Sequence, residues 1–235
     1  MLSYYLKEAY HWLFPFTCLL CGRANKIFGV CRSYRQELPW AVHGCQRCAN
    51  PVLSISSLCG KCLQKPPIYD DMLALFYYRS PIDHLLTSLK FSNQLIYAQL
   101  LGQLLAEHIK NHYLTRPKPE LIIPMPLHAS RLRQRGYNQA VELSRPIAKT
   151  MNIPLSFNQC QRIIATEPQS SIPAAARQQN VKNAFAIVAP ISAKHVAIVD
   201  DIVTTGSTVD ELIKILHRSG VTTIDLWCCA RTVLD

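Results

Sequence analysis

The sequence lacks the marks of a secreted or membrane-spanning protein. Its apolar stretch near the amino terminus, residues 12–20, is interrupted by Pro15. It is far shorter than the roughly 20 residues that a helix needs to cross a bilayer. Neither a basic start nor a small-residue cleavage site accompanies it, as a secretory signal would require. We therefore expect a cytoplasmic protein with no transmembrane segment, in which residues 1–17 form an amphipathic segment covering the domain.

Common nucleotide-binding and zinc-protease motifs are missing as well, because the chain contains no GxxxxGK[ST], GxGxxG or HExxH sequence. Acidic residues are scarce: 15 Asp and Glu stand against 25 Lys and Arg among 235 residues, which gives a net charge of +10. The basic excess is concentrated in residues 1–70 and 131–194. This balance favours anionic partners such as diphosphates, nucleic acid or anionic lipid, with a solvated basic surface as the alternative.

Cysteine, in contrast, is abundant, and seven of the ten cysteines lie between Cys18 and Cys62. Three pairs have CxxC spacing, which lets both thiolates of a tight turn face one metal ion. Cys45, Cys48, Cys59 and Cys62 form two such pairs. This pattern predicts a structural zinc site closed by four protein ligands. Disulfides are the weaker explanation in a reducing cytoplasm.

Cys18, Cys21 and Cys31 form an incomplete second set. Tyr34 stands where a further CxxC motif would place its last cysteine. A second zinc ion at this set needs another ligand, for which His43 is a candidate. Alternatively the three thiols are free, or Cys18 and Cys21 join a later pair around a single ion. The spacing leaves these alternatives open.

The segment Val196–Thr208, VAIVDDIVTTGST, carries the most informative pattern. Its first four apolar residues predict a strand buried on both faces, as in a parallel sheet. Asp200 and Asp201 then lie at the carboxyl end of that strand, where open α/β sheets bind ligands. The hydroxyl-rich loop that follows leads into a helix start, which suits a phosphate. The pattern predicts a sugar-phosphate site; simple helix capping is the alternative.

This segment resembles the phosphoribosyl-diphosphate-binding motif of type I phosphoribosyltransferases. The resemblance implies that Asp200 and Asp201 are the catalytic pair and contact the ribose 2′ and 3′ hydroxyls. It also implies that the 5-phosphate is held by the loop residues Thr204, Thr205, Gly206, Ser207 and Thr208. Mg²⁺ would accompany the diphosphate and remain largely bound by the substrate.

Basic residues elsewhere are weaker candidates for holding the diphosphate. RGYNQA, residues 135–140, resembles a family signature in the loop that faces the diphosphate. We expect Arg133 and Arg135 to contact the diphosphate, because the planar guanidinium meets phosphate oxygens in bidentate fashion. Arg135 is the first choice, and a solvated basic loop before a helix capped near Asn138 is the alternative.

Residues 165–183 are rich in small and polar residues and show no periodicity. In this enzyme class a mobile flap over the active site occupies that position, so Arg177 and Lys182 are further candidates for the diphosphate. A flexible linker is the alternative interpretation, because long loops without periodicity are either functional or disordered.

Hydrophobic spacing predicts the other elements of an α/β domain. We expect two helices within residues 84–113, broken near Ser92 and Asn93, and a helix over 209–220 ended by Gly220. Residues 71–82 are predicted to form a strand or the start of a hairpin. The predicted strands that follow are 121–127, the first core strand, 156–164, the second, and 222–232, the last.

A cysteine ribbon ahead of a phosphoribosyltransferase-like domain resembles the late-competence ComF family and its relative GntX over nearly the whole chain. The resemblance implies an α/β fold, with a type I phosphoribosyltransferase-like parallel-sheet core and a small N-terminal cysteine-rich zinc-ribbon module. The expected domains are residues 1–17, 18–66 and 67–235. The ribbon of that family often has four CxxC pairs. This chain has three such pairs and Cys31, whose expected partner position holds Tyr34.

The ComF resemblance implies a role in natural competence and DNA uptake, and it leaves two hypotheses for the pocket. In the first, the protein is a phosphoribosyltransferase whose acceptor, a nitrogen nucleophile, is unknown. In the second, it senses the ligand without turnover, and its ribbon and basic surface contact single-stranded DNA or DNA-uptake proteins. Four aromatic residues are candidates to stack on bases, although core packing explains them equally well: Tyr34, Trp40, Tyr77 and Tyr78.

Overall fold

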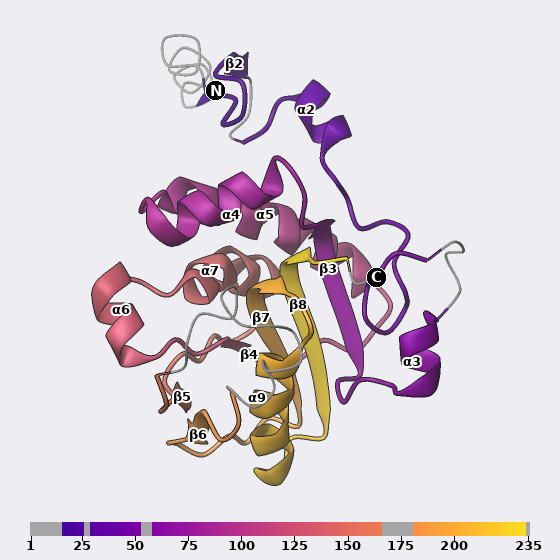
Figure 1. Cartoon of the computed structure of the whole chain (residues 1–235), viewed down its shortest axis with the longest axis vertical. Coiled ribbons are helices and arrows are strands. Elements are labelled where there is room, and N and C mark those ends of the chain that lie inside the picture. Colours follow the sequence, from indigo (N-terminus) through magenta and orange to yellow (C-terminus); the bar gives the residue numbers. More distant parts are fainter. Residues whose placement is uncertain (1–15, 26–28, 53–57, 166–180, 234–235) are drawn as a thin grey trace, which may run out of the picture. The chain divides into compact units, whose positions relative to one another are not determined.

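The computed structural model describes residues 16–25, 29–52, 58–165 and 181–233 (Figure 1). The chain divides into two compact units, Met1–Pro39 and Trp40–Asp235, and each is described by itself. The first cysteine set belongs to the smaller unit and the second set to the larger one. The predicted domain boundaries after residues 17 and 66 stay predictions. Among the helices of the described ranges, none combines the length and the apolar character that a membrane span requires.

The smaller unit is built around a short two-stranded sheet. β1 (Phe16–Thr17) pairs antiparallel with β2 (Ala24–Asn25), and in the turn between them Gly22 N donates to Cys18 O at 2.8 Å. Gly22 has a φ of 70°, a left-handed conformation that glycine adopts at least cost. The helix α2 (Arg32–Glu37) follows directly after Cys31. The turn thus closes around the first CxxC pair.

The larger unit is centred on a parallel sheet of four strands in the order β3–β8–β7–β4 (Figure 1). These strands are β3 (Asp71–Tyr77), β4 (Leu121–Pro124), β7 (His195–Val203) and β8 (Thr223–Arg231). The two central strands, β7 and β8, are almost entirely buried, as their continuous apolar runs predict for strands covered on both faces. The predicted α/β class with a parallel-sheet core is confirmed.

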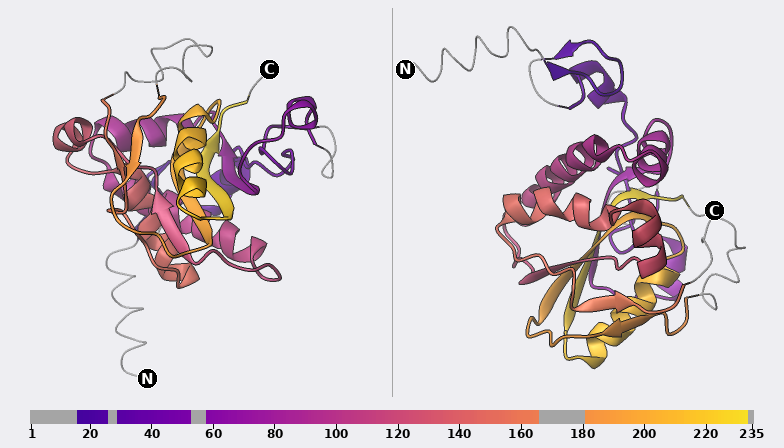
Figure 2. Two further views of the ribbon diagram at one scale, coloured as in Figure 1. Left: turned by 90° about the horizontal axis from the view of Figure 1, so that it is seen from below. Right: turned by 90° about the vertical axis from the view of Figure 1, so that its left-hand side faces the viewer.

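Helices cover both faces of this sheet (Figures 1 and 2). α9 (Ser207–Arg218) packs its apolar side on the face that includes Leu226. The neighbouring Trp227 points the other way, where its ring meets Tyr113 after the end of α5 (Leu95–His112). α7 (Gln139–Met151) packs on α5 and on the sheet, and α4 (Ile82–Phe91) packs on α5.

A glycine allows the close approach of α5 and α7. A Cβ atom at Gly102 of α5 would lie 2.7 Å from the backbone oxygen of Leu143 in α7 and 3.0 Å from the ring of Pro146. Any larger residue at this position would therefore push the two helices apart. Their spacing matters for function, because α7 begins at the pocket described below.

The shorter elements lie around this core. They are α3 (Gly60–Gln64), α6 (Ala129–Arg135), β5 (Cys160–Arg162) and β6 (Phe185–Ile187). β5 and β6 form a separate antiparallel pair. The segment that includes Cys45 adjoins the β3 edge of the main sheet, where Ala41 N donates to Leu75 O at 3.0 Å and the Trp40 ring packs on Phe76 at 4.6 Å.

The structure confirms most predicted element boundaries. α4 ends at Phe91 and α5 begins at Leu95, with Asn93 in a left-handed conformation between them, as predicted for the break. Asn138 caps α7 by accepting a hydrogen bond from Ala140 N at 3.0 Å. Gly220, with a φ of 97°, follows the end of α9.

Two element predictions need correction. Residues 156–164 do not add a full strand to the main sheet; only Cys160–Arg162 is extended, and it pairs with β6. Leu155 makes a single bridge to Ile122 before the chain diverges from the sheet. The basic segment after β4, expected as a loop, folds as the helix α6, which Gly136 ends in a left-handed conformation.

Candidate functional site

A pocket of about 570 Å³ lies at the carboxyl ends of β4 and β7, where α6 and α7 begin and α4 ends. Five of the residues predicted to hold the sugar phosphate or the diphosphate line it: Arg135, Asp200, Asp201, Thr204 and Thr208. This is the edge of a parallel sheet at which ligands bind in open α/β folds.

The two aspartates are anchored by the backbone and by one lysine. Asp200 Oδ1 accepts a hydrogen bond from Asp201 N, and Asp201 Oδ1 accepts one from Ile202 N, both at 2.8 Å. Asp201 Oδ2 lies 2.7 Å from Lys90 Nζ of α4. Although Asp201 is only 8% exposed, it lines the pocket beside Asp200. Both carboxyl groups are therefore held in fixed orientations at the pocket wall.

The electrostatic environment separates the roles of the two carboxyl groups. Burial raises the pKa of Asp200 to about 8, and the adjacent charge of Asp201 acts in the same direction, whereas Lys90 opposes the shift. The acid pair therefore retains a proton to higher pH than two separate carboxyl groups would, while Asp201 makes the ion pair with Lys90. One carboxyl group can then donate a hydrogen bond while the other accepts, which suits two neighbouring hydroxyl groups.

The loop after β7 turns sharply into α9. Gly206 precedes the first residue of that helix with a φ of 84°, and Thr205 Oγ1 lies 3.0 Å from Ser207 Oγ. Within the described residues, the backbone N–H groups of Thr205 and Gly206 donate to no other protein group. Thr204 and Thr208 line the pocket, whereas Thr205, Gly206 and Ser207 are not among its lining residues. The loop thus presents donors at the positive end of a 12-residue helix.

Four basic side chains line the same pocket: Lys90, Arg131, Arg135 and Arg162. Arg135 sits 5.6 Å from the ring centroid of Phe91, and burial lowers its pKa, an effect opposed by Asp201. Arg131 and Arg135 are one helical turn apart on α6, so both reach the pocket. Arg131 lies in the basic segment expected to face the diphosphate but was not chosen as a ligand residue, and neither Lys90 nor Arg162 was predicted. The i, i+4 spacing from Arg135 was the signal that could have selected Arg131.

The remaining candidates for the diphosphate lie elsewhere. Arg133 is exposed on α6 and Lys182 is exposed after the undescribed segment, and neither lines the pocket. Arg177 and most of the expected flap lie outside the described residues. Among the aromatic residues, Tyr78 lines the pocket, Trp40 packs on Phe76, and Tyr34 is exposed on α2.

The second cysteine set forms a compact cluster. The Sγ atoms of Cys45, Cys48, Cys59 and Cys62 all lie within 4.8 Å of one another, and those of Cys48 and Cys59 are 3.6 Å apart. A tetrahedral zinc site with Zn–S bonds of about 2.3 Å requires sulfur–sulfur distances of about 3.8 Å. Although burial opposes it, hydrogen bonds from backbone N–H groups lower the pKa of Cys45 to about 7, which favours the thiolate. The four residues therefore fit a closed structural zinc site.

The first cysteine set is also clustered. The Sγ atoms of Cys18, Cys21 and Cys31 lie within 4.8 Å of one another, and those of Cys21 and Cys31 are 3.9 Å apart. Cys31 N donates to Cys18 Sγ at 3.3 Å, in the same way that Cys59 N donates to Cys45 Sγ in the other cluster. The two clusters thus share one local geometry, which is what a repeated zinc knuckle produces.

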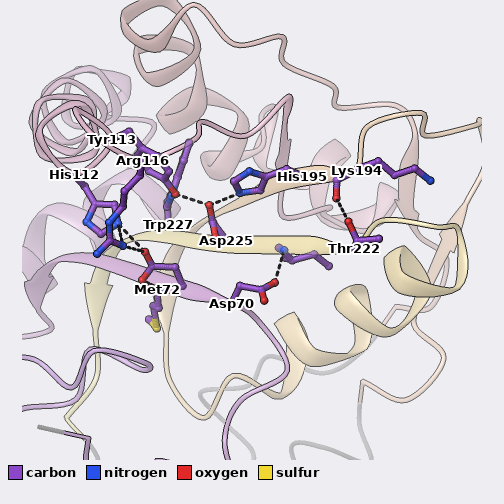
Figure 3. Close-up of polar contacts among 12 residues, drawn as sticks. Asp70, Met72, His112, Tyr113, Arg116, Lys194, His195, Thr222, Asp225 and Trp227 are labelled. Atoms are coloured by element: carbon purple, nitrogen blue, oxygen red, sulfur yellow. Dashed lines mark hydrogen bonds and ion pairs between the residues drawn. The ribbon is translucent and has the colours of Figure 1, made fainter.

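A second polar network lies near the amino ends of β3, β7 and β8 (Figure 3). Asp225 Oδ2 accepts a hydrogen bond from Tyr113 OH at 2.5 Å and lies 2.6 Å from His195 Nε2; Asp71 Oδ2 lies 2.7 Å from His112 Nε2. A hollow of about 660 Å³ adjoins these groups. Because both carboxylates are already bonded within the protein, this network ties the end of α5 to the sheet. The pocket at the carboxyl ends remains the better candidate for ligand binding.

Comparison with known proteins identifies the ribbon and close relatives. A family model described as a double zinc ribbon domain matches residues 9–63, a range that includes both cysteine clusters. The DNA utilization protein YhgH of Salmonella typhi is 34% identical over 223 residues, covering 93% of this chain and 98% of that protein. Competence protein F of Haemophilus influenzae is 33% identical over 228 residues, with the same coverage.

Solved structures similar to this chain are phosphoribosyltransferases and a related amidotransferase. Purine phosphoribosyltransferase from Pyrococcus horikoshii has a TM-score of 0.32 at 18% identity, covering 69% of this chain and 89% of that one. Glutamine phosphoribosylpyrophosphate amidotransferase from B. subtilis has a TM-score of 0.36 at 18% identity, covering 55% and 25%. At such scores the likeness carries no functional weight.

Proposed function

This chain belongs to the family of DNA utilization protein YhgH and competence protein F, and we propose that its pocket binds the ribose and the 5-phosphate of phosphoribosyl diphosphate or a related sugar phosphate. The observation that carries the proposal is the joint presence, in one pocket, of the paired acids Asp200 and Asp201 and of Thr204 and Thr208, which flank the turn that starts α9. Either feature alone is common in α/β proteins; together they match a pentose bearing a phosphate.

The groups in the pocket suggest a division of roles. Asp200 and Asp201 bond the ribose hydroxyls, and Thr204–Thr208 hold the 5-phosphate. The positive side chains face the diphosphate: Lys90, Arg131, Arg135 and Arg162. With four cationic side chains and two carboxyl groups, the lining of the pocket favours an anionic ligand such as a diphosphate with its Mg²⁺.

Ligand entry has to change the ion pair between Lys90 and Asp201. Asp201 Oδ2 is only 2.7 Å from Lys90 Nζ, so a ribose hydroxyl either shares that oxygen or displaces the lysine. The Lys90 side chain is 24% exposed and comes from the last turn of α4, next to Phe91 at the pocket wall. We propose that Lys90 turns from Asp201 toward the diphosphate when the ligand binds, so that its charge remains paired in both states.

A matched pair of ligands tests this assignment. Ribose 5-phosphate and 2-deoxyribose 5-phosphate differ by one of the two hydroxyls that the acid pair is proposed to bind. We expect calorimetry to show tighter binding of ribose 5-phosphate than of 2-deoxyribose 5-phosphate. Asp201→Ala should reduce this preference, whereas Thr205→Ala should lower the affinity for both sugars. Equal affinity for the two sugars, or the binding of inorganic phosphate as tightly as either, would contradict a ribose site.

Turnover is a separate question from binding. If the protein is a phosphoribosyltransferase, an acceptor nitrogen displaces pyrophosphate from the anomeric carbon, and pyrophosphate accumulates only when the acceptor is present. If it is a sensor, phosphoribosyl diphosphate binds in the presence of Mg²⁺ and remains intact. Measuring pyrophosphate release across a panel of nitrogen nucleophiles separates these outcomes, with Asp201→Ala as the control for chemistry outside the pocket.

The names of the relatives point to DNA. We propose that this protein acts in the uptake or use of DNA, and that it contacts single-stranded DNA or DNA-uptake proteins through its ribbon and its basic surface. The reduced thiols of the two cysteine clusters favour a reducing compartment such as the cytoplasm. Single-strand binding that weakens as salt rises and survives Asp201→Ala would support this role. The absence of such binding would contradict the proposed contact with single-stranded DNA and leave sugar-phosphate binding as the remaining proposed activity.

A further inference from the structure

One buried arginine joins the second cysteine cluster to the loop after β7. Arg231, the last residue of β8, is only 4% exposed. Its Nε atom donates to the backbone oxygen of Cys48 at 2.9 Å, and its Nη1 atom donates to that of Val203 at 2.9 Å and to that of Thr204. A single rigid guanidinium therefore contacts two segments that lie far apart in the sequence.

Each segment has a distinct proposed role. Cys48 belongs to the four-cysteine cluster, whose carbonyl positions depend on how the CxxC turn is folded around its ion. Val203 and Thr204 lead directly into the loop that starts α9, and Thr204 lines the pocket. The main chain adds a further link at the loop side, since Thr232 N donates to Val203 O at 3.0 Å. A shift at the cysteine cluster therefore reaches the pocket through one side chain.

The charge of Arg231 strengthens this link. Within the described residues no carboxylate lies within ion-pair distance of its guanidinium, and all three acceptors are neutral carbonyl oxygens. A buried cation without a countercharge is costly. Four thiolates around Zn²⁺ carry a net charge of about −2. A zinc-loaded cluster therefore places negative charge at the segment that Arg231 contacts through Cys48 O.

We propose that Arg231 is a positioning residue that couples zinc occupancy of the Cys45–Cys62 cluster to the conformation of the sugar-phosphate loop. When zinc is bound, the Cys48 carbonyl holds the guanidinium, which fixes the carbonyls of Val203 and Thr204. When zinc leaves, the CxxC turn that carries Cys48 shifts, the guanidinium loses that acceptor, and the loop relaxes. The statement about the loop stands on geometry alone, and the consequence for ligand affinity rests on the proposed function.

Amide hydrogen exchange tests the coupling without any ligand. Removing zinc from the wild-type protein with a chelator should accelerate exchange of the hydrogen-bonded amides at the loop, those of Ile202 and Thr232, by about tenfold or more, as the loss of one charge-assisted hydrogen bond implies. Exchange in α7 provides an internal reference and should stay slow. In Arg231→Met, which keeps the apolar stem but removes the donors, the loop should exchange rapidly with or without zinc.

The rate of zinc release tests the same link from Arg231 toward the cysteine cluster. Arg231→Met should release zinc to a colorimetric chelator several-fold faster than the wild type, because it loses the bond to Cys48 O. Arg218→Met, which removes an exposed positive charge at the far end of α9, is the matched control and should behave as the wild type. Arg231→Lys keeps the positive charge but not the planar guanidinium, so its rate of zinc release should lie between those of the wild type and Arg231→Met.

Several outcomes would overturn the coupling. One is a wild-type loop whose exchange is unchanged after zinc removal while α7 stays protected. Another is a folded Arg231→Met protein with normal loop exchange and normal zinc release. If zinc removal unfolds the whole unit, the zinc-bound Arg231→Lys and Arg231→Met proteins decide by their loop exchange alone.

The ligand measurement separates this proposal from the proposed function. A wild-type protein that fails to bind ribose 5-phosphate would refute the proposed function, while the exchange result still decides the coupling. A wild-type protein that binds ribose 5-phosphate equally well before and after zinc removal would refute the coupling and leave the proposed function standing.

Discussion

Replacing Gly206 with alanine gives a quantitative test of the loop. Gly206 has a φ of 84°, and an added Cβ atom would meet no other atom within 4 Å. The substitution therefore creates no clash, and its cost is the left-handed backbone alone, about 1–2 kcal/mol of unfolding free energy. For a domain of this size, that corresponds to a fall in melting temperature of about 2–8 °C.

Gly220 provides a matched control at the other end of α9. Its φ is 97°, and an added Cβ atom would meet only Lys194 Nζ, at an ordinary contact distance of 3.5 Å. Gly220→Ala should therefore cost about as much stability as Gly206→Ala, for the same reason. The two variants differ mainly in their distance from the proposed phosphate.

The effect on ligand binding should separate the two variants. In the free variant the strain at residue 206 favours a rotated loop backbone, and restoring the geometry in which the N–H groups meet the phosphate costs up to the same 1–2 kcal/mol, or roughly 5- to 30-fold in affinity. We expect calorimetry with ribose 5-phosphate to show this loss for Gly206→Ala and none for Gly220→Ala. If Gly206→Ala were destabilised as predicted but bound ribose 5-phosphate like the wild type, the loop would not hold the phosphate.

Three further substitutions test other parts of the molecule. Asp201→Ala should lower the affinity for ribose 5-phosphate by about tenfold or more. The control Asp83→Asn also removes a negative charge but lies on α4 outside the pocket, so it should leave the affinity unchanged; equal losses in both variants would assign the effect to net charge. Because the folded protein binds the Asp200 proton more tightly than the unfolded chain, Asp200 contributes stability at about pH 4 that is lost by about pH 8, so the stability advantage of the wild type over Asp200→Asn in urea should shrink across that range; a constant difference would contradict the raised pKa. Cys62→Ser should reduce the zinc content measured by atomic spectrometry, and an unchanged content would exclude Cys62 as a ligand.

Local patterns in the sequence predicted the elements that position the pocket. The apolar run before Asp200 predicted the buried strand β7, and Gly206 with its hydroxyl neighbours predicted the start of α9. The cysteine spacing predicted that Cys45, Cys48, Cys59 and Cys62 lie together, whereas it left the arrangement of the first set open. Each of these features depends on residues close in sequence, so hydrophobic period, turn chemistry and ligand spacing suffice to predict it.

Contacts between distant segments could not be predicted in the same way. Lys90 meets Asp201 only because α4 ends beside β7, and nothing near Lys90 in the sequence indicates this. Arg131 reaches the pocket because its segment is a helix, whereas a loop would not fix which arginines share a face. Arg231 was interpreted only as the end of a strand, although its side chain bonds Cys48 O. These roles depend on how the elements pack together.

The most direct test of the sugar-phosphate pocket is a calorimetric titration of the zinc-loaded protein with phosphoribosyl diphosphate in the presence of Mg²⁺. The account predicts saturable one-to-one binding that ribose 5-phosphate competes away and that Asp201→Ala weakens. A folded, zinc-containing protein that shows no binding, or binding that Asp201→Ala and Gly206→Ala leave unchanged, would contradict it.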